Sequence, residues 1–171
     1  PLCVIECKRP DIRDSIAQAI SQHLRNQKDD GIRSLYIYSA LLLSVATQSA
    51  SYATTATPEK FWAKWSEQFA DSEEENAHKQ ALYNLVNIKH INNKLFAERF
   101  HYVRQYFEQV YLAPITPSVQ DEYLYSLCRP ERLLELMYRY TLYDDGIKKI
   151  ARYRQYFAVC KTISRIRNIE G

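Results

Sequence analysis

Glycine and methionine are scarce in this sequence, which has three glycines and one methionine against 14 tyrosines. So little glycine predicts few tight turns and a helix-rich chain. The sequence also contains no G-x-x-x-x-G-K-[ST] loop, the backbone cradle that binds nucleotide phosphates. We therefore expect no ATP hydrolysis from this chain by itself.

Zinc-binding and membrane-spanning patterns are also missing. The four cysteines, Cys3, Cys7, Cys128 and Cys160, form no C-x-x-C, and no Cys/His cluster has zinc-ligand spacing. Cys3 and Cys7 share one face of an N-terminal apolar run, so we expect them to be small core residues. There is no signal peptide and no apolar run near the length of a membrane span. These absences favour the reducing cytoplasm.

The composition that remains is that of a globular protein, with 46% hydrophobic and 25% charged residues among 171. This length suffices for one full core. The net charge of +3 is compatible with nucleic-acid binding but does not establish it. Because the sequence opens on a strand without an initiator methionine and closes on Ile-Glu-Gly, we expect a fragment of a longer chain.

The first eight residues, Pro-Leu-Cys-Val-Ile-Glu-Cys-Lys, form an apolar run that ends with two charges. In a strand, Glu6 and Lys8 point the same way, roughly 7 Å apart at about 3.3 Å per residue. Neither charge belongs in a core unless it is paired or binds a metal. A hydrophobic strand followed by E-x-K is typical of PD-(D/E)xK nucleases, whose carboxylate binds Mg²⁺ and whose lysine stabilises the scissile phosphate or helps to activate water. The pattern alone is weak, because many surface strands contain it.

A helix is predicted for residues 12–27, with Asp11 as its N-cap. The polar face of this helix carries Gln18 and Gln22, one turn apart, and can be either a solvated face or a contact surface. The apolar run 40–46 predicts a strand buried on both faces. The order strand, helix, strand predicts a βαβ-like unit with E-x-K at the carboxyl end of its first strand, where active sites of open α/β sheets lie.

Helical periodicity dominates the remaining chain. Residues 52–57 read as an edge strand or loop, and Thr57-Pro58-Glu59 predicts a helix start. That helix would carry an aromatic stripe, more typical of a core than of a base-stacking surface: Phe61, Trp62, Trp65 and Phe69. Residues 71–76 are expected to be an acidic, solvated loop.

Further helices are predicted around Leu82 to Val86, from Leu95 to Leu112, and over 119–127 and 130–142. The second of these would turn five apolar side chains inward: Phe96, Phe100, Val103, Phe107 and Val110. Asp144-Asp145-Gly146 predicts a turn, followed by a basic last helix over about 147–168. Its cations are Lys148, Lys149, Arg152, Arg154, Lys161, Arg165 and Arg167. Such a helix can contact phosphate or an acidic partner, or can simply be solvated.

Five segments together resemble the nuclease region of the restriction (R) subunit of type I restriction-modification enzymes, in the same order. They are Val-Ile-Glu-Cys-Lys, Ser-Ile-Ala-Gln-Ala-Ile-Ser-Gln-His-Leu-Arg-Asn-Gln, Thr-Pro-Glu-Lys-Phe-Trp-Ala-Lys-Trp, Leu-Cys-Arg-Pro-Glu-Arg-Leu-Leu-Glu-Leu and Lys-Lys-Ile-Ala-Arg-Tyr-Arg-Gln-Tyr-Phe-Ala-Val. The resemblance covers nearly the whole chain. Each segment is weak alone, and their shared order carries the resemblance.

The resemblance implies roles for particular residues. Glu6 and Lys8 match the E-x-K of the family, with Glu6 as a Mg²⁺ ligand. The glutamine of its Q-x-x-x-Y motif, a DNA-backbone contact, falls on Gln22, with Gln18 as the alternative. The tyrosine of that motif is replaced by Asn26. The second metal-binding aspartate of the family lies upstream of the E-x-K strand.

The last helix resembles the lead-in to the helicase-like ATPase motor of the family, with Gln155 in its adenine-recognising segment. The resemblance implies ATP as a cofactor of the full-length protein. It also implies three partners: double-stranded DNA, the modification (methyltransferase) subunits and the specificity subunit. The specificity subunit sets the DNA site, so this sequence does not predict it.

We therefore predict a helix-rich α/β fold in which residues 1–113 form a PD-(D/E)xK nuclease-like core with a small mixed sheet. Residues 114–171 would be a helical connector into an ATPase motor. The expected function is Mg²⁺-dependent cleavage of double-stranded DNA, coupled to ATP-driven translocation in the full protein, with the fragment alone inactive. One alternative is a non-catalytic helical module that binds DNA or partner subunits. Another is a related nuclease from a different system.

Overall fold

The computed structural model describes residues 2–88, 96, 98–110 and 112–169. The strands are β1 (Cys3–Cys7), β2 (Leu41–Ala46), β3 (Ser49–Ala53), β4 (Thr141–Asp144) and β5 (Ile147–Ile150). The α-helices are α1 (Ser15–Asn26), α2 (Arg33–Tyr36), α3 (Ser72–Val86), α4 (Arg104–Val110), α5 (Val119–Cys128), α6 (Pro130–Arg139) and α7 (Tyr153–Ile169). Two 3₁₀ segments are η1 (Glu59–Phe61) and η2 (Glu98–Val103). The predicted helix-rich α/β class is confirmed.

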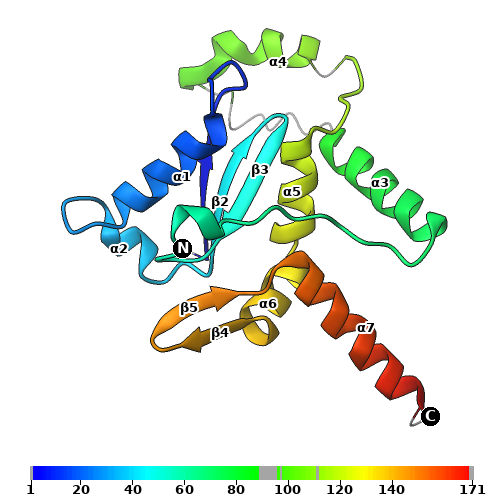
Figure 1. Cartoon of the computed structure of the whole chain (residues 1–171). Helices are drawn as coiled ribbons and strands as arrows, with labels where there is room; N and C mark the ends of the chain where they lie inside the picture. Colours follow the sequence, from blue (N-terminus) through cyan, green and yellow to red (C-terminus); the bar gives the residue numbers. More distant parts are fainter. Residues whose placement is uncertain (1, 89–95, 97, 111, 170–171) are drawn as a thin grey trace.

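The N-terminal sheet has the strand order β1-β2-β3 (Figure 1). Strands β1 and β2 are parallel, with α1 and α2 between them in sequence, and β3 returns antiparallel to β2. The predicted βαβ-like unit and mixed sheet are therefore present. Helix α1 lies on one side of this sheet and α5 on the other (Figure 1).

Every residue of β2 is buried, as its continuous apolar sequence predicts. Leu41, Leu43 and Val45 point into the main core, which α5, α6 and α7 complete. The alternate residues of β2 face the other way, toward α1. The main core contains residues from before and after position 113. The division of the chain into two domains at this position stays a prediction.

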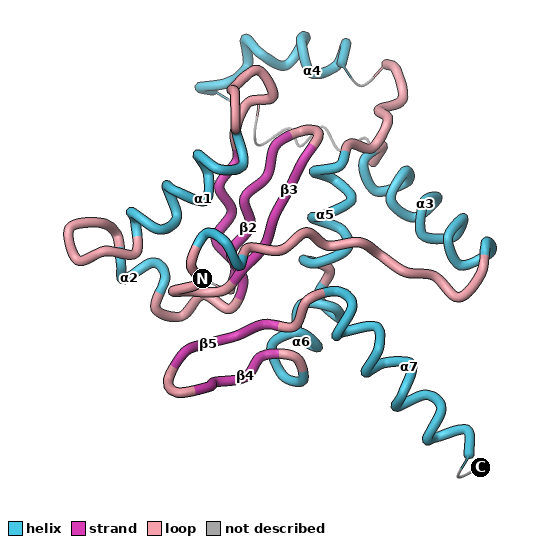
Figure 2. Tube along the Cα trace, viewed as in Figure 1, coloured by secondary structure: helices cyan, strands magenta, loops and turns pink. Residues whose placement is uncertain are grey.

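The predicted helix after Thr57 is wrong. Only the short η1 turn forms, and an extended segment then crosses the molecule to α3 (Figure 2). Ala63 explains this conformation, because its backbone N–H and C=O bond Tyr52 of β3, at 3.0 and 2.8 Å. Trp65 then enters the core, as expected of an aromatic stripe, but Phe61 stays exposed.

The acidic run 71–76 is also not a loop, because α3 starts within it. The side chain of Asp71 caps the helix by accepting from the backbone N–H of Glu74 at 2.9 Å. Three glutamates occupy the first turn, where negative charge stabilises the positive end of the helix dipole. The acidic residues therefore mark a helix start.

The helix predicted from Leu95 to Leu112 differs from the structure. Leu95 lies outside the described residues, while the described part consists of η2 and α4. Phe100, Phe107 and Val110 are exposed, so these side chains do not point inward as expected.

The helices predicted at 119–127 and 130–142 are present as α5 and α6, although α6 ends at Arg139. The next segment is a hairpin, so the predicted start of the last helix near Ile147 is wrong. Asp145 and Gly146 both have positive φ, 51° and 74°, which suits a tight hairpin turn. Lys148 and Lys149 consequently belong to β5, and α7 begins at Tyr153.

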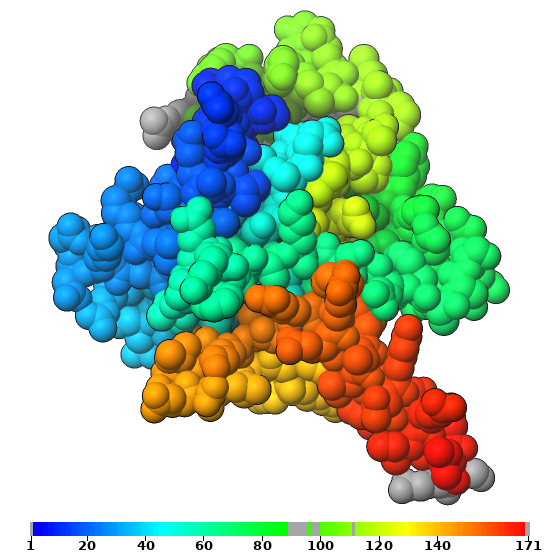
Figure 3. Space-filling view, in the orientation of Figure 1, coloured from blue at the N-terminus to red at the C-terminus, as the bar shows by residue number. Residues whose placement is uncertain are grey.

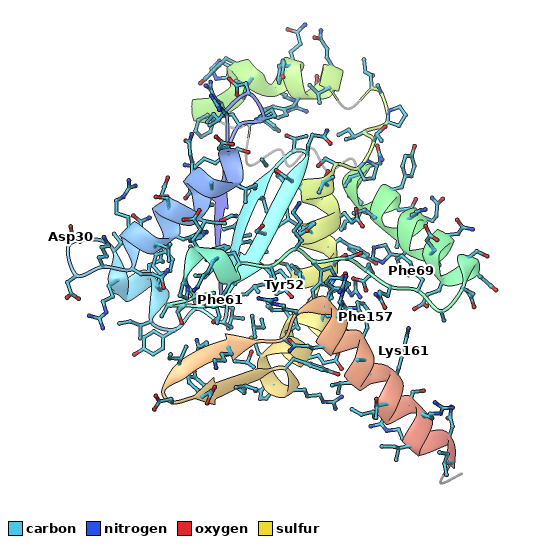
Figure 4. All side chains as sticks on the ribbon, viewed as in Figure 1. Asp30, Tyr52, Phe61, Phe69, Phe157 and Lys161 are labelled. Atoms are coloured by element: carbon cyan, nitrogen blue, oxygen red, sulfur yellow. The ribbon has the colours of Figure 1, made fainter. Side chains whose placement is uncertain are left out.

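Side-chain hydrogen bonds connect the β4–β5 hairpin and the residue after it to the region of the N-terminal sheet. The Tyr52 hydroxyl donates to the carbonyl of Ala151 at 2.9 Å, and the Lys148 ammonium donates to the carbonyl of Ser39 at 2.8 Å. Figure 4 shows Tyr52 and Phe157 near the place where the sheet meets α7. No helix within the described ranges is long and apolar enough to cross a membrane.

Candidate functional site

Glu6 and Lys8 lie on the same face of the first strand, as the two-residue period predicts. The Lys8 ammonium is 2.9 Å from Glu6 Oε1, and the two side chains are 17% and 21% exposed. The backbone N–H of Lys8 continues the pairing with β2 by donating to the carbonyl of Val45 at 2.9 Å. The acid–lysine pair is thus held at the carboxyl end of β1, partly sheltered from solvent.

Helix α1 brings a third polar group to this pair. The Lys8 ammonium donates to the side-chain oxygen of Gln22 at 2.6 Å, across 14 residues. The side chain of Gln18 instead donates to the backbone carbonyl of Arg13 at 2.9 Å. Of the two candidate glutamines, the structure places Gln22 on Lys8 and Gln18 nearer to solvent.

The start of α1 differs from the sequence-based expectation. Asp14 is the N-cap residue, with a left-handed φ of 53° and no side-chain cap bond, so the prediction that Asp11 caps the helix is wrong. Asp11 instead forms an exposed ion pair with Arg9 at 3.3 Å. Cys7 is exposed and Cys3 is half-buried, so only Cys3 packs against the core as expected.

His23, which follows Gln22, was not predicted as part of this site. It is fully buried, with Nε2 at 3.0 Å from the carbonyl of Leu43 and Nδ1 at 3.1 Å from the hydroxyl of Tyr36. The carbonyl can only accept, so a neutral ring carries its proton on Nε2. Burial lowers the pKa of His23, which favours this neutral form. The ring therefore fixes α1 to β2 immediately beside Gln22. The sequence could have indicated that His23 is buried, because His23 lies on the apolar face of α1.

Glu6 is the candidate metal ligand of this cluster. The described residues contain no group of three or more His, Cys, Asp or Glu side chains that could hold a metal ion. Mg²⁺ does not need such a group, because it often binds through one or two carboxylates, water and substrate phosphates. A carboxylate that is partly accessible beside a lysine is compatible with this kind of coordination.

Gln155 lies in a different part of the molecule. Its side-chain oxygen accepts from the backbone N–H of Arg152 at 2.9 Å, at the start of α7. Gln155 also lines a cavity of about 930 Å³ formed by β3, η1, the β4–β5 hairpin and α7. Figure 3 shows the chain around residue 60 lying directly above the hairpin in this region. The lining is mostly apolar and includes four cationic side chains: Arg139, Lys148, Lys149 and Arg152. Two of them are paired with carboxylates, Arg139 with Glu135 and Lys149 with Asp144.

The fold and the Glu6–Lys8–Gln22 cluster together define an α/β domain with an acid–lysine pair beside a helical glutamine. Residues 1–61 match the family described as type I restriction enzyme R protein N terminus. This match confirms the predicted resemblance over residues 1–61 and is consistent with a fragment of an R subunit. It spans β1 to η1 and so includes the whole cluster. The segments of the resemblance that follow residue 65 stay a prediction. No curated protein and no solved structure matches the chain.

Proposed function

We propose that this chain carries the DNA-cleaving site of a type I R subunit, with a PD-(D/E)xK-like core. The observation that carries the proposal is the position of the Lys8 ammonium, which contacts both Glu6 and Gln22 within the segment that matches the family. The reaction would be hydrolysis of phosphodiester bonds in double-stranded DNA.

Each member of the cluster has a distinct role in this proposal. Glu6 would hold Mg²⁺, which when bound polarises the phosphate and lowers the pKa of a bound water. Lys8 would place its positive charge beside the scissile phosphate, where negative charge develops in the transition state. Gln22 would keep Lys8 in place and contact the DNA backbone, with Gln18 as a second contact on the same helix.

The remaining expectations concern the full-length protein. We propose that Gln155 contributes to nucleotide binding at the start of an ATPase motor, supported by its place on a large, mostly apolar cavity that also carries Lys148 and Arg152. The same proposal includes ATP-driven translocation and assembly with the modification and specificity subunits. It also includes the domain division near residue 113 and a location in the cytoplasm. All of these expectations rest on the resemblance to R subunits.

The test uses the complete R subunit, assembled with its modification and specificity subunits on plasmid DNA with Mg²⁺ and ATP. Glu6→Gln and Lys8→Met should each abolish DNA cleavage and leave ATP hydrolysis unchanged. Glu131→Gln, which alters an exposed glutamate on α6, should retain both activities. Cleavage at the wild-type rate by the Glu6→Gln protein would overturn the proposal.

A second candidate is a non-catalytic module that binds DNA or partner subunits. The ion pair between Glu6 and Lys8 favours it, because these two charges already neutralise each other within the fold. In that case Glu6→Gln would reduce the stability of the domain without affecting the rate of DNA cleavage. Unfolding and cleavage measurements on the same variant therefore separate the two candidates.

A further inference from the structure

The strand β2 has one polar residue in an otherwise apolar sequence, Leu-Leu-Leu-Ser-Val-Ala. Ser44 is fully buried, and its hydroxyl has no hydrogen-bond partner among the described residues. A buried hydroxyl without a partner destabilises a fold, and alanine would fit the same space without that cost. Such a group therefore needs an explanation beyond packing.

The register of the sheet places Ser44 beside the candidate site. Ser44 pairs with Glu6 in the parallel ladder of β1 and β2, where neighbouring strands lie about 4.8 Å apart. Paired residues in a sheet point to the same face, so Ser44 shares the face of Glu6 and Lys8. The flanking residues Leu43 and Val45 point the opposite way, into the main core. Ser44 is thus the immediate neighbour of Glu6 on the strand next to it.

Helix α1 limits what else the Ser44 hydroxyl can reach. Ala19, Ile20 and His23 of α1 are buried against this face, and the His23 ring already occupies the carbonyl of Leu43. These groups exclude water from the sheet surface around Ser44. Two polar residues flank Ser44 on this face, Glu6 on β1 and Ser51 on β3. In the described part of the chain the Ser44 hydroxyl bonds to neither of them, and of the two the carboxylate of Glu6 is the charged acceptor.

The carboxylate of Glu6 has an oxygen available for such a bond. Lys8 contacts Oε1, and no hydrogen bond to Oε2 is found within the described part of the chain. A serine hydroxyl can turn among three staggered positions and donate one hydrogen bond. Donation from Ser44 to Glu6 would give the hydroxyl a partner and the carboxylate a second one beside Lys8.

We propose that Ser44 is a positioning residue for Glu6, whose hydroxyl donates to the carboxylate when Glu6 binds a divalent cation. The inference rests on the proposed function, because it assigns a partner to the metal ligand of that site. Metal-binding carboxylates are generally oriented by outer hydrogen bonds, and loss of such a bond weakens metal binding about 10–100-fold. Ser44 would supply this bond from the interior of the sheet.

The experiment measures Mn²⁺ affinity, by electron paramagnetic resonance in the absence of nucleotide, and the Tm of the complete R subunit. Mn²⁺ replaces Mg²⁺ as the probe because carboxylate and water ligands suit both ions. Ser44→Ala should weaken Mn²⁺ binding about 10–100-fold and leave the Tm unchanged or slightly raised. Ser126→Ala is the matched control. Ser126 is also fully buried and its hydroxyl has no partner among the residues that the structure describes, but it lies on α5 across the sheet.

Three results would overturn the inference. The first is unchanged Mn²⁺ affinity in Ser44→Ala, and the second is an equal loss in Ser126→Ala. The third is a large fall in Tm for Ser44→Ala, which would mean that the hydroxyl has a structural partner. Glu6→Gln separates this inference from the function on which it rests. If Glu6→Gln binds Mn²⁺ as well as wild type, the proposed function itself fails. If only Glu6→Gln loses affinity, the role of Ser44 alone fails.

Discussion

The guanidinium of Arg132 on α6 donates to both carboxylate oxygens of Glu67, at 2.7 and 3.2 Å. Both side chains are almost fully buried. The indole N–H of Trp65 donates to the same carboxylate at 2.7 Å, and the guanidinium lies 4.5 Å from the ring centre of Tyr156. This pair therefore joins the extended segment that follows β3 to both α6 and α7.

Glu67→Gln should destabilise the protein strongly. The substitution leaves the charge of Arg132 buried without its partner, which typically costs about 3–5 kcal/mol. Urea unfolding at neutral pH measures this loss. Glu108→Gln is the control, because the Arg104–Glu108 pair is exposed and should change the free energy of unfolding by no more than about 1 kcal/mol. Equal effects of the two substitutions would contradict the prediction.

The same pair predicts how the protein responds to acid. Burial alone would raise the pKa of Glu67, but hydrogen bonds from Arg132 and Trp65 and the charges of Arg132 and Arg129 lower it overall. The stabilisation from Glu67 is thus complete above its unfolded-state pKa of about 4.3 and is lost as the pH falls through the lower folded-state value. Unfolding free energies from pH 6 down to pH 3 should fall less steeply in Glu67→Gln than in wild type.

His23 predicts a second pH dependence in a higher range. Burial lowers its pKa in the folded state, opposed by the Leu43 carbonyl and by Glu6 and assisted by Lys8. As the pH falls, His23 therefore takes up its proton in the unfolded chain before it does so in the folded protein. The free energy of unfolding should then decrease as the pH drops below about 6.5. Urea unfolding between pH 7.5 and pH 5 should show this slope in wild type and a smaller slope in His23→Gln.

A control for the His23 measurement is available in the same chain. Burial also lowers the pKa of His78, which lies away from the site beside Phe69 and Tyr125. His78→Gln should remove the contribution of His78 to the pH dependence of the unfolding free energy and leave the contribution of His23 in place. A His23→Gln profile parallel to that of wild type would show that His23 does not contribute in this range.

Substitutions of the two glutamines of α1 should have unequal effects on cleavage. Gln22→Leu removes the 2.6 Å hydrogen bond from the Lys8 ammonium, whereas Gln18 bonds only to a nearby backbone carbonyl. A hydrogen bond to a charged group contributes about 1.5–3 kcal/mol, so Gln22→Leu should slow DNA cleavage by at least about tenfold. Gln18→Leu should have a smaller effect in the same single-turnover assay. The reverse order would assign the motif glutamine to Gln18.

Strands β1 and β2 and the helices α5 and α6 were predictable because local sequence and tertiary packing agree there, whereas β3 lies at Ser49–Ala53 and not at the edge strand or loop expected over 52–57. The apolar run 40–46 has enough hydrophobic surface to be buried on both faces, whatever packs around it. Pro130 at the first position of α6 suits a helix start, since its missing N–H would have no helical partner. Both segments consequently adopt the structure that their own residues favour.

The incorrect predictions have two different causes. The extended segment after Phe61 depends on Ala63 pairing with Tyr52, a contact that no local pattern contains. The β4–β5 hairpin, in contrast, had a local signal in Asp145-Gly146 and in the two-residue alternation of Ile-Lys-Lys-Ile, which the helical interpretation overlooked. Asp71 and Glu74 likewise carried a capping signal within the acidic run.

The candidate site was predictable only in part. The two-residue period of a strand was sufficient to place Glu6 and Lys8 on one face. The choice between the two glutamines required the rotation of α1 about its axis, which the bonds of His23 to Leu43 and Tyr36 fix. Ser44 also required the register between β1 and β2, which a single sequence does not determine.

Strand β1 pairs only with β2 within the described residues, so it is an edge strand of the sheet there. Ile5 of this strand and Leu2 just before it are exposed. An uncovered, apolar strand edge is a template on which another chain can add a strand, and association of this kind leads to aggregation. A purified preparation that lacks a cover for this edge should therefore associate as its concentration rises. Because β1 also carries Glu6, the proposed DNA cleavage and the tendency of the protein to aggregate should both depend on this strand.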